Sequence, residues 1–366
     1  MSSKDETTHP NLSLVLTKIP TGPPIPGTDL TTLPQPISLS APLAPNTLLA
    51  KTLYISLDPY MRGRMREAHI PSYSPAYPLN EAITAYGLIQ VLRSNHPLYS
   101  PGQIIYSRVP AQEYSILGTE LDWASTKIIP YQPTQDGAGV GLSHYLGVLG
   151  MTGLTAYSGL YEIGRPKRGE TIYISSAAGA VGAIVGQIAK KEGLRVIGSC
   201  GGEKKVKYVV EELGFDGCFD YRVEGTREAL KRLVPEGVDV YFENVGGEML
   251  EGVLERMNEG GRVVVCGMIS QYNLKPEERY GIKNLNLMVT KRIHMQGFIV
   301  TDANFGPKYD KERDGKVSAW LRDGSIIAKE HLTAGIENGP EAFVAMLRGE
   351  NLGKAILKIA DPETDL

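Results

Sequence analysis

The sequence predicts an α/β fold in which a doubly wound parallel sheet accompanies a second domain rich in β-strands. Three observations carry this prediction. After Gly164, strand-like segments alternate with helix-like segments of about ten residues, as in parallel β-α-β units. Eighteen of the 24 prolines lie at or before Pro133, which favours loops and short strands there because proline removes a backbone donor. The chain has 366 residues, of which 42% are apolar and 22% charged, enough for two folded domains.

The first part of the chain contains short strands separated by turns rich in glycine and proline. The clearest strand-like segments are Thr47–Ile55, Ala85–Leu92 and Gln103–Arg108. Near the other end, Gly339–Leu347 is a predicted helix and Lys354–Ile359 a predicted strand. A strand this late can rejoin the N-terminal strands, which would make the first domain discontinuous.

The region after Gly164 alternates regularly between the two element types. The predicted strands are Thr171–Ser175, Arg195–Ser199, Cys218–Tyr221, Val238–Phe242 and Arg262–Cys266. The predicted helices are Val181–Ala189, Glu203–Leu213, a segment that begins near Thr226 and ends before Pro235, and Met249–Met257. Thr226 is the expected N-cap of its helix.

Charge and composition exclude several classes of protein. The formal net charge is -3, which argues against a general binder of nucleic acid or anionic membranes. The uncharged stretches 137–161 and 171–189 are interrupted by glycines, so neither is a spanning helix, and the N-terminus lacks a signal-peptide pattern. Three cysteines, 18 and 48 residues apart, match no metal or disulfide framework. We therefore expect a cytoplasmic protein without a metal site.

The segment Ser175–Gly182 is a candidate dinucleotide-binding turn. In the register of that fingerprint, Gly179 and Gly182 hold the second and third glycine positions, and Ala177 replaces the first. The second glycine lets the backbone approach a pyrophosphate, and the third lets the helix pack on the strand. The alternative is a tight strand–helix turn that binds nothing. The flanking strand, helix and second strand favour the Rossmann interpretation.

The end of the next strand favours NADPH over NADH. An NAD site places an acid there to bind the ribose 2′-hydroxyl. Here the strand ends in Gly198–Gly202 without an acid, and Lys204, Lys205 and Arg222 follow. Cations at this place favour a 2′-phosphate. The alternative is that the lysines form a solvated helix face.

Several segments, in order along most of the chain, carry a resemblance to a known family. They are Ser56–Met65, Tyr145–Tyr157, Ala177–Gly182, Glu243–Gly247, Cys266–Asn273 and Asn351–Lys354. They resemble the medium-chain dehydrogenase/reductase superfamily, and within it the zinc-independent branch of prostaglandin reductases and plant alkenal double-bond reductases. The resemblance implies a GroES-like β-rich domain at 1–140, completed by 310–366, and a Rossmann domain at 141–309, with the active site in the cleft between them. It also implies NADPH-dependent reduction of the C=C bond of α,β-unsaturated ketones or aldehydes, and commonly a homodimer.

The resemblance also implies roles for individual residues. At the cofactor, these are Lys205 and Tyr221 near the 2′-phosphate, Gly179, Val181 and Gly182 at the pyrophosphate turn, Asn244 at the ribose or phosphate, Met151 and Thr152 by the nicotinamide, the Phe298–Val300 backbone at the carboxamide, and Asn351 closing over the cofactor. The family often has aspartate where this chain has Glu243. If only Asn244 touches the cofactor, that change should move little.

Hydride transfer to the β-carbon of an enone creates an enolate, whose oxyanion needs a hydrogen-bond donor. Tyr272 is the leading candidate, because it follows a strand end and a phenol stays protonated at neutral pH. Tyr60 and Arg62 are second candidates, and Asp58 with Arg62 is expected to be a structural pair. Two other functions stay open: a quinone reductase of the same superfamily, and a non-catalytic nucleotide-bound protein.

Overall fold

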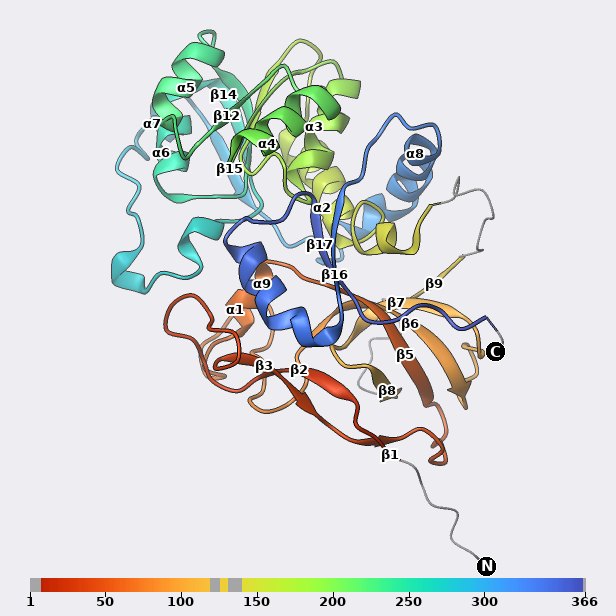
Figure 1. The fold of residues 1–366 in the computed structure, drawn as a ribbon. Coiled ribbons are helices and arrows are strands. Elements are labelled where there is room, and N and C mark those ends of the chain that lie inside the picture. Colours follow the sequence, from red (N-terminus) through yellow and green to blue (C-terminus); the bar gives the residue numbers. More distant parts are fainter. Residues whose placement is uncertain (1–7, 119–125, 131–139, 365–366) are drawn as a thin grey trace, which may run out of the picture. The chain divides into compact units, whose positions relative to one another are not determined.

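The computed structural model describes residues 8–118, 126–130 and 140–364 of the chain (Figure 1). Two compact units share these residues. The first comprises Met1–Leu146, Glu330–Glu350 and Ala355–Leu366, and the second comprises Gly147–Lys329 and Asn351–Lys354. The predicted domain boundary at 140 directly follows residues 131–139. Those residues, which include Pro133, lie outside the described part of the chain. Residues 310–329, which the sequence assigned to the β-rich domain, belong to the second unit.

The second unit is built on a six-stranded sheet whose neighbouring strands are all parallel. Its strands are β10 (Thr171–Ile174), β11 (Arg195–Cys200), β12 (Gly217–Asp220), β13 (Val238–Glu243), β14 (Met257–Val265) and β15 (His294–Gly297). Their spatial order is β12-β11-β10-β13-β14-β15. The order reverses between β10 and β13, which is the switch point where open α/β sheets bind ligands. The predicted doubly wound Rossmann fold is confirmed.

Helices cover this sheet on both faces (Figure 1). The helices of this unit are α2 (Met151–Gly159) with its π-helical continuation Leu160–Gly164, α3 (Gly182–Lys191), α4 (Glu203–Lys207) continued by Tyr208–Glu212, α5 (Thr226–Leu233), α6 (Gly247–Arg256), α7 (Leu287–Thr290) and α8 (Asp310–Arg322). Among the described residues, the last of them, α8, packs on α2 and not on the sheet. Successive side chains of a strand point to opposite faces of the sheet, so neighbouring residues of β13 contact helices on different faces. Tyr241 packs with Leu230 of α5 and Leu250 of α6, whereas Phe242 lies against Gly159 of α2.

The first unit is mostly β-structure, as predicted. Its main sheet has the order β16-β17-β5-β6-β7-β9, with β8 also paired to β5. The strands of the unit are β1 (Thr8–His9), β2 (Leu12–Leu16), β3 (Leu30–Pro34), β4 (Ile37–Ser38), β5 (Leu48–Ser56), β6 (Thr84–Ser94), β7 (Ile104–Pro110), β8 (Tyr114–Leu117), β9 (Lys127–Ile129), β16 (Glu330–Ala334) and β17 (Lys354–Lys358). Leu357 of β17 pairs with Ile55 of β5, so the late strand does rejoin the N-terminal β-structure.

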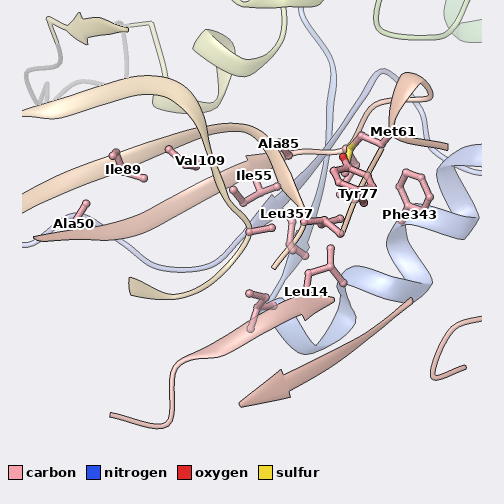
Figure 2. Close-up of a cluster of buried hydrophobic side chains, with 14 of the residues drawn as sticks. Leu14, Ala50, Ile55, Met61, Tyr77, Ala85, Ile89, Val109, Phe343 and Leu357 are labelled. Carbon is pink, nitrogen blue, oxygen red and sulfur yellow. The ribbon is translucent and has the colours of Figure 1, made fainter. Parts of the chain in front are cut away.

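A buried apolar cluster joins distant parts of the sequence in this unit (Figure 2). Leu14 of β2, Ile55 of β5 and Leu357 of β17 meet there with Phe343 of α9 (Gly339–Leu347), and none of the four is exposed. Met61 of α1 (Tyr60–Arg64) belongs to the same cluster. The core therefore fixes the short helix that carries Tyr60.

One local prediction was wrong. Thr226 is the first residue of α5 rather than its cap: the N-cap is Gly225, and no side chain caps this helix. Residues 310–322 form α8, which packs in the second unit, where Glu312 accepts a hydrogen bond from Tyr157 of α2 at 2.8 Å. The contact joins residues far apart in sequence, and local periodicity does not reveal such contacts.

Candidate cofactor and active site

The predicted glycine turn connects β10 to α3. Ser176 adopts a left-handed conformation (φ 54°), and its carbonyl accepts the N–H of Gly179 at 2.9 Å. A Cβ at Gly182 would lie 2.5 Å from the Ser176 carbonyl oxygen, and one at Gly179 would lie 3.0 Å from the Ser176 Oγ. The turn is thus closed so tightly that only hydrogen fits at Gly182, and a side chain at Gly179 would crowd Ser176. Bare backbone of this kind is what a pyrophosphate requires.

The alanine in the first position of the fingerprint is matched by a glycine on the next strand. A Cβ at Gly198 of β11 would lie 2.6 Å from the Cβ of Ala177. The space that the first glycine leaves open in the fingerprint is here provided by Gly198. The missing side chain at Gly198 of β11 thus leaves room for the Ala177 side chain in the turn.

The segment that contains Asn351 lies beside the glycine turn. The N–H of Gly353 donates to the carbonyl of Ala178 at 2.9 Å, and Gly353 forms an isolated parallel bridge with Gly179. The side-chain amide of Asn351 donates to the carbonyl of Gly353 at 2.6 Å. The structure therefore brings Asn351 to the turn, as the prediction that it lies at the cofactor requires.

Cationic and phenolic side chains gather where β11 and β12 end. A Cβ at Gly201 would lie 2.8 Å from the Arg222 Nε and 2.9 Å from the Tyr221 hydroxyl. The Arg222 guanidinium stands 6.0 Å from the centre of the Tyr221 ring. Lys205 lies on α4, which begins just after Gly202. These donors, without an acid at the end of β11, fit a 2′-phosphate.

Asn244 joins the ends of β10 and β13. Its backbone N–H donates to the Ser175 Oγ at 2.9 Å, and its side-chain amide donates to the Ser175 carbonyl at 2.8 Å. These bonds cross the switch point of the sheet. Asn244 is therefore held at the edge where a dinucleotide binds in this fold.

Met151 and Thr152 begin α2 after a compact turn. The Thr152 hydroxyl donates to the Gly147 carbonyl at 2.9 Å. A Cβ at Gly153 would collide with the carbonyl of Val148, so this turn also requires glycine. The guanidinium of Arg313, 1% exposed, reaches the carbonyls of Val148 and Gly150 at 3.3 and 3.2 Å. Sequence reasoning missed Arg313, because nothing in its own neighbourhood signals a contact with α2.

Phe298 and Val300 follow the carboxyl end of β15. The Phe298 ring stacks on Phe305 with a centroid distance of 4.5 Å, and a Cβ at Gly159 would lie 3.0 Å from it. A Cβ at Gly306 would collide with the Val300 carbonyl. Packing thus fixes the course of this backbone, and its binding of the carboxamide stays a prediction.

Tyr272 lies in the segment after β14, at the end of the 3₁₀ turn Ile269–Gln271. Its hydroxyl accepts the N–H of Met268 at 3.1 Å and lies over Gly267, where a Cβ would stand 2.9 Å from it. A phenol hydroxyl can both accept and donate a hydrogen bond. The position past the carboxyl end of a strand is consistent with the predicted role.

Tyr60 belongs to the first unit and begins α1. Its hydroxyl is buried and has no hydrogen-bond partner among the described residues. Burial raises the pKa of Tyr60 well above 10, Tyr77 and Asp58 raise it further, and Arg108 acts in the opposite direction. The phenol is therefore neutral over the working pH range. Nearby, Arg62 donates to the Gly22 carbonyl at 2.9 Å, and Asp58 accepts from Ser56, both as structural contacts.

Comparison with known proteins identifies the family. Residues 13–122 match the N-terminal domain of oxidoreductases, and residues 180–311 match the family described as zinc-binding dehydrogenases. The NADP-dependent oxidoreductase RED1 of Cochliobolus heterostrophus is 46% identical over 98% of this chain and 100% of its own. The chain belongs to the medium-chain dehydrogenase/reductase superfamily. The 2-alkenal reductase of Nicotiana tabacum is 41% identical over 88% of this chain and 90% of its own. The crystal structure of CurA from Vibrio vulnificus in complex with NADPH, 37% identical, superposes with a TM-score of 0.86 over 96% of this chain and 100% of its own.

These matches place the chain in the zinc-independent reductase branch of the superfamily, as the sequence predicted. No cluster of three or more metal-binding side chains occurs within the described residues of the reductase. In the same part of the chain, no helix is long and apolar enough to cross a membrane. Desolvation raises the pKa of the Cys266 thiol to about 12, which keeps it protonated near neutral pH.

Proposed function

We propose that this reductase transfers hydride from NADPH to the β-carbon of α,β-unsaturated aldehydes and ketones and so reduces their C=C bond. The observation that carries the proposal is the glycine turn, closed by Gly179 and Gly182, beside the donors Lys205, Tyr221 and Arg222. A bare pyrophosphate turn with cations at the next strand end suits NADPH. The tobacco relative, a 2-alkenal reductase dependent on NADP⁺, supports the reaction class.

The chain's own residues would bind the cofactor along the carboxyl edge of the sheet. Gly179, Val181 and Gly182 would face the diphosphate, and Asn244 the ribose or phosphate. Met151 and Thr152, with the backbone of Phe298–Val300, would hold the nicotinamide and its carboxamide. Asn351 would close over the cofactor. In this arrangement NADPH supplies the hydride. The protein's main contribution is to orient the two reactants, because the nicotinamide C4 must be held close to the β-carbon of the substrate.

Reduction of an enone leaves negative charge on the carbonyl oxygen, and the protein must stabilise it. We assign this hydrogen bond to Tyr272, with a ribose hydroxyl of the cofactor as a second donor. Tyr60 is the second candidate, because its buried hydroxyl has no partner among the described residues and a substrate oxygen would satisfy it. Water can then protonate the α-carbon, which completes the addition of H⁻ and H⁺ across the bond.

The decisive experiment is a spectrophotometric screen of NADPH oxidation with enones, enals and quinones, with identification of the products. We expect saturated ketones and aldehydes from the first two classes. Turnover of quinones alone would make the protein a quinone reductase of the same superfamily. Absence of NADPH oxidation with all three classes would favour a non-catalytic nucleotide-bound protein and refute the proposal.

We also propose a homodimer formed through the edge of the parallel sheet. In the described part of the second unit, β15 pairs with β14 on one side only, and an open edge strand is a template for pairing with another chain. Leu285 and Val289, which precede β15 in the sequence, are 46% and 79% exposed. Sedimentation analysis should find two chains per particle, and Val289→Asp should shift the equilibrium toward monomer.

The free thiols of Cys200, Cys218 and Cys266 support a reducing compartment such as the cytoplasm.

A further inference from the structure

A buried acid that has no part in the proposed chemistry lies among the candidate cofactor residues. Glu243 is the last residue of β13 and has no exposed surface. Its Oε1 accepts the backbone N–H groups of Val245 and Gly246 and, at 3.2 Å, the hydroxyl of Ser175. One oxygen thus binds the turn that follows β13 and the residue that follows β10.

The backbone of the same residue reaches a third strand end. The Glu243 carbonyl accepts the N–H groups of Cys266 and Gly267 at 2.9 and 3.1 Å, directly after β14. The Asn244 carbonyl accepts the N–H of Ile269 at 3.1 Å, in the segment that leads to Tyr272. Glu243 is therefore bonded to the ends of β10, β13 and β14, the three strands around and beside the switch point.

The acceptor geometry, rather than a charge, accounts for these contacts. The second oxygen, Oε2, is buried and has no hydrogen-bond partner among the described residues. Burial raises the pKa of Glu243, although the N–H groups of Gly246 and Val245 lower it. Burying a carboxylate with one unpaired oxygen is costly, and a neutral acid lowers that cost. A neutral side chain with the same Oε1 acceptor should serve as well.

We propose that Glu243 is a positioning residue for the cofactor, because its Oε1 holds Ser175 and the Asn244–Gly246 turn in the arrangement that binds the dinucleotide. The inference rests on the proposed NADPH site. Ser175 carries the two hydrogen bonds from Asn244 and is the residue from which the glycine turn starts. Loss of the Oε1 acceptor would leave the N–H groups of Val245 and Gly246 unpaired and free this turn to move.

The test compares Glu243→Gln with Glu243→Met. Glutamine keeps one acceptor oxygen and is neutral, whereas methionine has similar length and no comparable acceptor. The dissociation constants of NADPH and NADH are measured by fluorescence titration of the full chain, which requires no turnover. We expect Glu243→Gln to bind both nucleotides within about threefold of wild type. We expect Glu243→Met to bind both about tenfold more weakly, because the N–H groups of Val245 and Gly246 lose their acceptor.

The two nucleotides separate positioning from phosphate recognition. Glu243→Met should leave the ratio of the NADPH and NADH constants unchanged, because the 2′-phosphate donors lie at the ends of β11 and β12. Leu254→Ala is the matched control: it opens a cavity in the apolar cluster that contains Tyr241 and Leu250, and it should lower the melting temperature without changing either constant.

Wild-type affinity in Glu243→Met would overturn the proposal, and so would a Glu243→Gln variant as weak as the methionine variant. If Glu243→Met does not fold, Ser175→Ala tests the Ser175 part of the arrangement, because it removes the hydroxyl that donates to Oε1 and accepts the N–H of Asn244. Wild-type affinity there would also overturn the proposal. A wild type that binds NADPH but reduces no enone would refute the proposed reaction without affecting the proposal for Glu243. A wild type without affinity for either nucleotide would overturn both.

Discussion

Replacement of Gly182 by alanine tests the geometry of the glycine turn most directly. The new Cβ would lie 2.5 Å from the Ser176 carbonyl oxygen and 3.0 Å from the Ala177 Cα. Both neighbours are backbone atoms, so no flexible side chain can move aside. The oxygen must retreat by roughly 0.9 Å to reach an ordinary contact of 3.4 Å, and overpacking of this kind costs about 1–3 kcal/mol.

The displaced atoms belong to the turn that would receive the diphosphate. We therefore expect Gly182→Ala to lower the melting temperature by several degrees and to weaken NADPH binding about tenfold or more, by thermal denaturation and fluorescence titration of the full chain. NADH binding should weaken equally, because both nucleotides share the diphosphate.

Gly315→Ala is the matched control for this substitution. Gly315 lies in α8 and has no atom near the position of a new Cβ, so alanine there should stabilise the helix by up to about 1 kcal/mol and leave nucleotide binding unchanged. If Gly182→Ala were as stable as wild type and bound NADPH equally well, the close approach at this turn would have no functional meaning, and the reasoning would be refuted.

Three further predictions follow from the site. Lys205→Ala should raise the Michaelis constant for NADPH several-fold and leave that for NADH nearly unchanged, since one cation at a partly exposed phosphate contributes about 1 kcal/mol; equal effects on both would remove Lys205 from phosphate recognition. Tyr272→Phe should lower turnover roughly tenfold to a hundredfold while the NADPH dissociation constant stays near wild type, and full activity would rule out an essential phenol. Dialysis against a chelator should leave activity intact, because catalysis by a phenol and a nucleotide needs no metal; a loss restored by zinc would contradict this.

The fold was largely predictable because its signals are local. Buried strands such as Thr171–Ile174 and Val238–Glu243 are short apolar runs, and α3 shows apolar residues at helical spacing. The parallel sheet follows from their alternation. Predicted strands in the first unit agree with β5, β6 and β7 to within a few residues.

The candidate site was predictable where a motif is contiguous. The glycine turn stands in one stretch of sequence, and its required context of strand, helix and strand could be checked there. The contacts that support it could not be found in this way. Gly198 makes room for Ala177, and Arg313 holds the turn before α2, only because strands and helices far apart in sequence pack together. The pairing of Gly353 with Ala178 belongs to the same class.

The connection of Gly353 to the glycine turn has a consequence for how the protein is made. The second unit includes Asn351–Lys354, although the segments on either side belong to the first unit. During synthesis, the Ala178 carbonyl cannot accept this hydrogen bond until Gly353 has left the ribosome. Contacts of such long sequence separation form late in folding, so nascent chains that end before Gly353 should carry the nucleotide turn incompletely formed.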